Sequence, residues 1–239
     1  MIKTSAFTPG LLLLVAVAAA ADERAGTPAD WPAPMPAPGP FWMVQGDRLE
    51  STVAESGDSY AWELQGWYGY DRQRLRWKTD GEGEWGERPE AAELQLLYSK
   101  LFAPYWEWQL GVRNDFRPGD GRLFAVAGLQ GTAPYQFEID SALFVSEDGD
   151  LSVRFEAEYD LLITQRLVLQ PRLELNLSLS DVVETGEQSG DIGSEIGLRL
   201  RYELRRELAP YAGVSFERVD DAGGSQSDVA LVAGLHFWF

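Results

Sequence analysis

Residues 166–180 read RLVLQPRLELNLSLS, and this stretch decides the fold. Leucine occupies the odd positions from 167 to 179, apart from Pro171, while the even positions from Gln170 to Ser178 are polar or charged. Successive side chains of a β-strand point to opposite faces, so a period of two predicts a strand with one apolar and one polar face. The same alternation recurs over 150–163 and 192–206, which predicts an all-β fold.

Such two-faced strands fit either a soluble sandwich, with leucines in the core, or a membrane barrel, with leucines toward lipid. Strands of soluble sheets usually run ~5–6 residues, whereas a strand that spans a membrane needs about 9–11 residues. Because the segments reach the greater length, we predict a transmembrane antiparallel up-and-down β-barrel over 41–239. We count about 12 strands, with about 10 as the alternative because 42–80 is the least regular stretch. The expected strands are 42–54, 59–71, 72–80, 91–102, 105–116, 121–131, 134–146, 149–163, 165–180, 191–206, 209–220 and 228–239.

The connections between these segments differ at the two ends of the predicted barrel. Short turns such as 71–72 and 103–104 fall on the side of the chain ends, and longer or acidic loops such as 81–90 and 181–190 fall on the other. Outer-membrane barrels have short periplasmic turns and longer outer loops, so both chain ends are expected on the periplasmic side. The last segment alternates up to Phe239, and a final strand that ends in phenylalanine resembles the signal read by the outer-membrane assembly machinery.

The N-terminal residues predict export. Lys3 precedes an apolar run at 11–18, and the small residues 19–21 offer a cleavage position before Asp22. This run is shorter than the about 20 apolar residues of a membrane-spanning helix, so we predict a cleaved signal peptide at 1–21. Proline recurs through 22–40, and because proline lacks the N–H that strands and helices need, this Pro/Ala-rich segment is expected to be an extended tether.

The composition excludes several classes of protein. The 239 residues carry a formal net charge of −18, which argues against nucleic-acid binding because phosphates require a basic face. The chain has no cysteine, so a disulfide framework, a thiolate metal site and a cysteine nucleophile are ruled out. The mean hydropathy of −0.24 is too low for a polytopic helical membrane protein, although it fits alternating barrel strands. The 9 Trp and 9 Tyr residues suit a membrane–water interface.

If the leucine faces meet lipid, the opposite faces line the lumen, and charges of both signs are dense there. Neighbouring charges pair across strands, which predicts an ion-pair network that braces a narrow barrel. A negatively lined path that favours cations is the other interpretation, and the sequence leaves both open. The predicted network comprises Glu107, Arg113, Asp115, Glu138, Asp140, Arg154, Glu156, Glu158, Asp160, Arg172, Glu174, Glu195, Arg199, Arg201, Glu203 and Arg205, and the same lining includes Glu63, Arg74, Arg76, Lys78 and Glu93.

Soft metal ligands are few. After removal of the signal peptide they are Met35, Met43 and His236. In a closed barrel the first and last strands are neighbours, so Met43 and His236 are expected near one rim, within reach of Met35 on the tether. Thioether and imidazole groups suit Cu(I), and carboxylates suit harder ions. The alternative is that His236 is a hydrogen-bonded interior residue and that Met43 faces lipid.

Several stretches resemble the copper resistance protein B family of Gram-negative outer-membrane proteins. The most specific is EYDLLITQRLVLQPR at 158–172, and GTAPY at 131–135, GLRLRYE at 197–203 and RELAPY at 206–211 agree with it. The resemblance implies a role in copper homeostasis at the outer membrane, alongside periplasmic copper proteins. It further implies that copper ions are bound or passed as ligand or cargo, with no reaction catalysed.

One segment departs from the family pattern. Members commonly carry a Met- and His-rich segment between signal peptide and barrel, whereas the tether here holds Met35 alone. A copper-related function would therefore depend on His236, Met43 and the lumen carboxylates, or on a partner that brings the metal. The alternatives are a non-specific small-cation pore and a structural barrel. A hydrolase is disfavoured, because His236 is the one histidine and no G-x-S-x-G motif is present.

Overall fold

The computed structural model describes residues 39–54, 57–116, 121–181, 188–221 and 224–239. The predicted signal peptide, Met35 and the tether up to residue 38 lie outside these ranges. Within them the chain forms twelve long strands and a two-residue strand, β9. The bounds are β1 (Phe41–Ala54), β2 (Asp58–Tyr70), β3 (Gln73–Glu84), β4 (Ala91–Ala103), β5 (Trp106–Asp115), β6 (Arg122–Ala133), β7 (Phe137–Ser146), β8 (Leu151–Tyr159), β9 (Leu161–Leu162), β10 (Leu167–Ser178), β11 (Ile192–Tyr202), β12 (Leu208–Asp221) and β13 (Gly224–Trp238).

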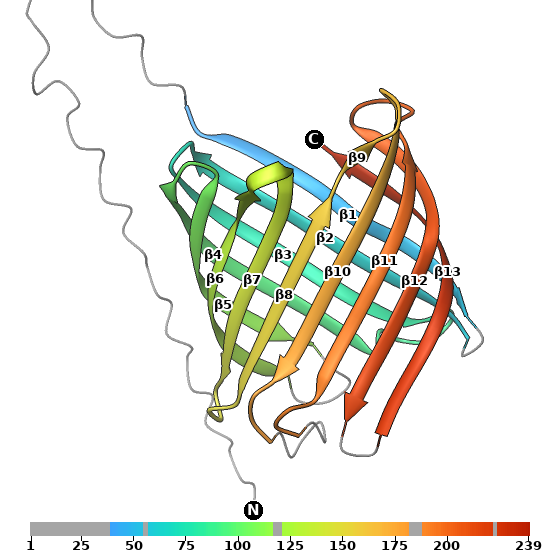
Figure 1. The fold of residues 1–239 in the computed structure, drawn as a ribbon. Helices are drawn as coiled ribbons and strands as arrows, with labels where there is room; N and C mark the ends of the chain where they lie inside the picture. Colours follow the sequence, from blue (N-terminus) through green and yellow to red (C-terminus); the bar gives the residue numbers. More distant parts are fainter. Residues whose placement is uncertain (1–38, 55–56, 117–120, 182–187, 222–223) are drawn as a thin grey trace, which may run out of the picture. The chain divides into compact units, whose positions relative to one another are not determined.

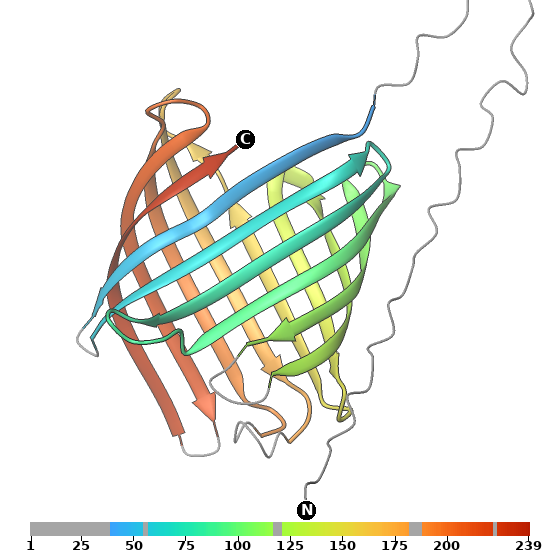
Figure 2. The same ribbon diagram turned by 180° about the vertical axis from the view of Figure 1, so that it is seen from behind.

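Each strand pairs antiparallel with its neighbours, and the sheet closes on itself. The long strands follow one another around the barrel in chain order, β1 pairs with β13, and β9 continues the pairing of β8 with β10. Figures 1 and 2 show this barrel from two sides. The predicted all-β barrel of twelve long strands is confirmed for the described ranges, and the alternative of ten is wrong.

Helical structure is confined, in the described residues, to the 3-10 turn η1 (Pro134–Gln136). No helix in that part of the chain is long and apolar enough to cross a membrane.

Five strand ends differ from the expected positions by three residues or more. β7 begins at Phe137 rather than 134, β8 ends at Tyr159 rather than 163, and β13 begins at Gly224 rather than 228. The other two are the ends of β3 and β11.

β3 continues to Glu84 rather than ending near 80, because Gly81 and Glu82 still pair with β4. β11 ends at Tyr202, the last residue paired with β10, although the alternation in sequence continues to 206. Arg205 therefore lies exposed in the turn between β11 and β12, and its predicted place in the lumen network is wrong.

The two ends of the barrel segment meet at one rim. The Val44 N–H donates to the Phe239 carbonyl oxygen at 2.9 Å, and the Phe239 N–H donates to the Val44 carbonyl oxygen at 2.8 Å. The turns that follow β2, β4 and β11 lie at this rim, which we call the turn end, and the connections that follow β3, β10 and β12 lie at the other, the loop end (Figure 1). The connections that follow β3 and β10 are long, as predicted, but the predicted long loop at 221–227 is wrong, because β12 runs to Asp221 and β13 begins at Gly224.

The barrel is apolar outside and charged inside. Large apolar side chains stand exposed on the outer face, as with Leu231 at 64% exposure, while arginines and glutamates are buried, as with Arg199 at 2%. This reverses the usual arrangement of a soluble protein, in which charged groups are almost never buried unless paired. It fits a barrel whose outer face contacts lipid and whose charges pair within the lumen.

A β-bulge in β1 changes which residues of that strand face inward. Gly46 pairs with Leu64 and Arg48 with Glu63, so Asp47 is an extra residue without a partner on β2. Asp47 accepts a hydrogen bond from Gln65, and its neighbour Arg48 contacts Glu63 and Glu195. Both consecutive side chains thus face the lumen, which a regular strand does not allow.

Close packing of strands gives a first prediction. A Cβ atom at Gly213 of β12 would lie 2.3 Å from the Leu198 carbonyl oxygen and 2.9 Å from the Arg199 Cα. Because both are backbone atoms, we expect Gly213→Ala to lower the free energy of unfolding by about 1–3 kcal/mol. The measurement is urea unfolding followed by tryptophan fluorescence.

Gly193→Ala is the matched control. A Cβ at Gly193 would meet nothing closer than the Asn176 Cβ at 3.7 Å, an ordinary contact. This variant is expected to be neutral or slightly stabilising, because alanine restricts the unfolded chain more than glycine does. Equal losses in the two variants would contradict the packing argument.

Candidate functional site: the charged lumen

Two large cavities occupy the lumen. One of about 730 Å³ lies toward the loop end, and one of about 600 Å³ lies toward the turn end. Both are lined by Glu63, Asp80, Phe144, Arg154 and Glu156, so these residues mark the level at which the cavities meet. We call this group, together with Arg172, the septum.

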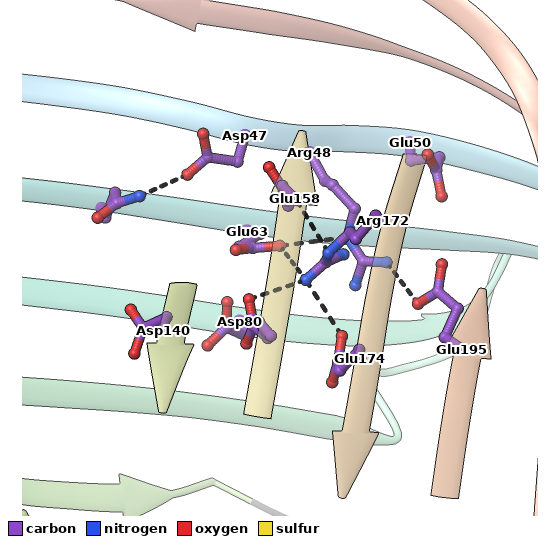
Figure 3. A network of polar contacts seen from close by, with 12 residues as sticks. Asp47, Arg48, Glu50, Glu63, Asp80, Asp140, Glu158, Arg172, Glu174 and Glu195 are labelled. Atoms are coloured by element: carbon purple, nitrogen blue, oxygen red, sulfur yellow. Dashed lines mark hydrogen bonds and ion pairs between the residues drawn. The ribbon is translucent and has the colours of Figure 1, made fainter. Parts of the chain in front are cut away.

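Arg172 of β10 is the most heavily paired cation of the septum. Its Nη2 lies 3.0 Å from Glu63, 3.2 Å from Glu156 and 3.1 Å from Glu174, and its Nε lies 3.0 Å from Glu158. The side chain is 3% exposed. Figure 3 shows the guanidinium reaching between strands of facing walls. Four carboxylates around one cation leave a local surplus of negative charge.

Arg48 and Arg199 extend the cluster toward β11. Arg48 Nη1 lies 3.0 Å from Glu195 Oε2, and Arg199 Nη2 lies 3.1 Å from Glu195 Oε1. Arg199 also forms two hydrogen bonds with Glu50 of β1, at 2.8 and 3.1 Å. Among the described residues, Arg48, Arg172 and Arg199 thus contact six glutamates, Glu50, Glu63, Glu156, Glu158, Glu174 and Glu195.

A second set of pairs ties β8 to β4. Arg154 donates two hydrogen bonds to Glu93, at 2.9 and 3.0 Å, and its Nη1 lies 3.6 Å from Asp80. Arg113 also contacts Glu93 at 2.9 Å, and its guanidinium lies over the Phe144 ring. Phe144 belongs to a small apolar patch on the inner wall with Leu97, Phe124 and Val126. Cation–π contacts with the Phe144 ring of this patch help to hold the Arg113 and Arg154 guanidinium groups in the lumen.

Further pairs join other strands. Lys78 of β3 pairs with Asp140 of β7, and Arg76 pairs with Glu107. Apart from Arg205, each residue of the predicted network lines a cavity or, as with Arg199 and Glu195, pairs with a residue that does. The pairing bridges facing walls as well as adjacent strands, which the sequence alone does not indicate.

His236 lies at the turn end, beside a third cavity of about 230 Å³. Its Nδ1 is 3.8 Å from Asp47 Oδ1, and the cavity lining also includes Glu138, Glu158 and Asp160. Met43 shares the rim, but Gln45 pairs with Trp238, so Met43 lies beyond the level of His236 on β1. The structure therefore places a carboxylate, rather than the Met43 thioether, beside the imidazole.

Other lumen residues carried too weak a sequence signal to be predicted. Arg48 and Glu50 share the parity of Trp42, and only the bulge at Asp47 turns them inward. Asp80 stands at the expected end of its strand, although β3 continues beyond it. A β-bulge next to a run of alternating residues leaves no dependable mark in a single sequence.

The donor set defines the chemistry of the lumen. Within the described ranges, no three His, Cys, Asp or Glu side chains are arranged to hold a metal ion. The carboxylates are instead distributed along the lumen and paired with arginines. This arrangement attracts cations electrostatically without a ready-made coordination sphere.

Comparison with known proteins agrees with a β-barrel of this kind. A family model described as "Copper resistance protein B precursor (CopB)" matches residues 40–239. Copper resistance protein B from Escherichia coli is 41% identical over 206 residues, which are 83% of this chain and 69% of that protein. Copper resistance protein B homolog from Pseudomonas syringae pv. tomato is 40% identical over 201 residues, 81% of this chain and 68% of that protein.

Among solved structures, the NanC porin matches with a TM-score of 0.53 at 12% identity, covering 82% of this chain and 99% of that one. At this identity the likeness concerns the fold alone, which is a porin-type β-barrel. The family model and the two relatives span most of the sequence. The chain therefore belongs to the copper resistance protein B family.

Proposed function

We propose that this chain is an outer-membrane β-barrel that supports copper tolerance by binding copper ions in its lumen or passing them across the membrane. The observation that carries the proposal is the surplus of carboxylates in the lumen, where six glutamates surround Arg48, Arg172 and Arg199 among the described residues. Acidic pore linings favour cations. The family to which the chain belongs makes copper the cation to test first.

The remaining parts of the proposal follow from the sequence. Export would use the signal peptide at 1–21, and the barrel would sit in outer-membrane lipid with its turn end toward the periplasm. A periplasmic copper protein is the expected partner at that rim. Copper is ligand or cargo, and we propose no catalysed reaction.

The donors favour passage of the divalent ion over a resident site. Carboxylates are hard ligands, and imidazole binds Cu(II) readily, whereas a soft Cu(I) site needs thioethers or thiolates. The lumen provides many carboxylates and, at the turn end, His236 beside Asp47. We therefore propose that Cu(II) would meet His236 and Asp47 first and the septum next.

A non-specific small-cation pore is the second candidate. Carboxylates without a fixed coordination geometry discriminate poorly between cations. The lack of a three-residue metal cluster in the described part of the chain favours this alternative. It predicts conductance with no dependence on copper.

The test is the copper tolerance of a deletion strain. We expect deletion to lower tolerance and the wild-type gene to restore it. The deletion strain is then complemented with a double variant, His236→Ala combined with Met43→Leu. If the double variant fails to restore tolerance, these two side chains are needed for copper handling. If it restores tolerance fully, the lumen carboxylates or a partner protein handle the copper. Unchanged tolerance on deletion would contradict the copper proposal and leave the cation pore or a structural barrel.

A further inference from the structure

The two large cavities are separated by side chains that cross the lumen. The Arg172 guanidinium of β10 reaches Glu63 of β2 at 3.0 Å. Between these strands lie four strands on one side of the barrel and six long strands on the other, in the part of the chain that the structure describes. The Arg172–Glu63 contact therefore joins opposite walls, at the level where both cavities share their lining.

The contacts of Arg172 are distributed unequally between the two walls. Glu156 and Glu158 belong to β8 and Glu174 to β10, so three of its four carboxylate partners lie on its own wall. Glu63 alone, of the partners in the described residues, lies across the lumen. If the Glu63 contact breaks, Arg172 keeps three carboxylates within reach and leaves no uncompensated buried charge.

The neighbouring bridge is anchored differently. Arg154 holds Glu93 on the far wall through two hydrogen bonds, and Arg113 holds the same carboxylate. Releasing Arg154 would therefore break a bidentate charge-assisted pair, which is among the stronger polar contacts in proteins. Of the two bridges, Arg172–Glu63 is the one that can open at low cost.

We propose that the Arg172–Glu63 bridge is a gate between the two cavities. In this state Arg172 closes the lumen. When Arg172 releases Glu63 and withdraws toward Glu156, Glu158 and Glu174, which it already contacts, a passage for small cations opens beside Glu63. The remaining carboxylates keep the passage negative and so cation-selective. For copper ions the inference rests on the proposed function, whereas the gate itself concerns any small cation.

The test is conductance of the purified full chain in planar lipid bilayers with KCl. Glu63→Ala removes the carboxylate that holds Arg172 across the lumen, and we expect a several-fold rise in conductance over wild type. Asp220→Ala is the control, because it also deletes a carboxylate from an ion pair with an arginine, Arg218 at 2.8 Å, but Asp220 lines neither large cavity. We expect the control to stay close to wild type. Equal conductance in all three proteins, or an equal rise in both variants, would overturn the gate.

Arg172→Gln removes the other partner of the Arg172–Glu63 ion pair. It keeps the proposal testable if Glu63→Ala folds poorly. This variant should also conduct more than wild type. Its reversal potential in a KCl gradient should shift further toward cation selectivity than that of Glu63→Ala, since it removes a positive rather than a negative charge. Conductance at the wild-type level in folded Arg172→Gln would likewise overturn the gate.

The KCl measurement involves no copper, so the two proposals fail separately. A rise in conductance without any change in the copper tolerance of cells that carry Glu63→Ala would leave the gate standing and contradict copper passage through it. Unchanged conductance would overturn the gate whatever the copper tolerance of the deletion strain.

Discussion

Glu50→Ala is expected to lower the free energy of unfolding by about 3–5 kcal/mol, the cost of leaving one partner of a buried ion pair without the other. The side chains of Glu50 and Arg199 are each 3% exposed, and their carboxylate and guanidinium form hydrogen bonds at 2.8 and 3.1 Å. The variant leaves Arg199 with Glu195 as its remaining carboxylate partner in the described residues, at 3.1 Å. Urea unfolding in lipid vesicles, followed by tryptophan fluorescence, measures the loss.

Asp220→Ala is the control for Glu50→Ala. Arg218 and Asp220 also form an ion pair, at 2.8 Å, but their side chains are 50% and 41% exposed. Exposed pairs contribute roughly 0–1 kcal/mol. Similar losses in Glu50→Ala and Asp220→Ala would contradict the assignment of Glu50 to a desolvated pair. Adding Arg199→Met to Glu50→Ala should recover much of the loss, because the unpaired charge is then removed as well.

The second large effect concerns the outer face. Leu198 lies in the middle of β11, points outward and is 43% exposed. If lipid covers this face, Leu198→Arg should lower the free energy of unfolding in vesicles by about 2–4 kcal/mol, the penalty for a cation near the bilayer midplane.

Leu204→Arg is the matched comparison for Leu198→Arg. Leu204 follows the end of β11 and is 57% exposed. Near the interface the same substitution costs about 0–1 kcal/mol. A penalty that is equal at both positions would argue against a lipid-covered outer face, since exposure alone is greater at Leu204.

The barrel could be predicted from sequence because each strand carries its own signal. In β10 the leucines at 173 and 175 alternate with Glu174 and Asn176, and the two polar residues line the lumen cavity whereas these leucines do not. Local periodicity is thus sufficient for the strands and for most of the charged lining. It fails at β1, where the bulge at Asp47 reverses the parity, and at Arg205, where alternation outlasts the pairing of β11.

The partners within the lumen could not be predicted in the same way. Glu63 and Arg172 meet because β2 and β10 face one another once the sheet is closed, and that distance depends on strand number and tilt rather than on either local sequence. The same holds for His236, which lies beside Asp47 because closure of the barrel pairs β1 with β13, with Gly46 opposite Phe237. The types of residue that line the lumen could therefore be predicted from the sequence, but their arrangement in space could not.

The seam between β1 and β13 has a consequence for the speed of folding. Gln45 pairs with Trp238, so the sheet closes through residues from the two ends of the barrel sequence, and until that moment it has two free edges. Pairing between such distant residues is slow compared with formation of the local hairpins. The ladder across this seam is also interrupted between Gly46 and Glu50. The time for which both edges stay unpaired, rather than the strength of any ion pair, is expected to limit the yield of refolded barrel.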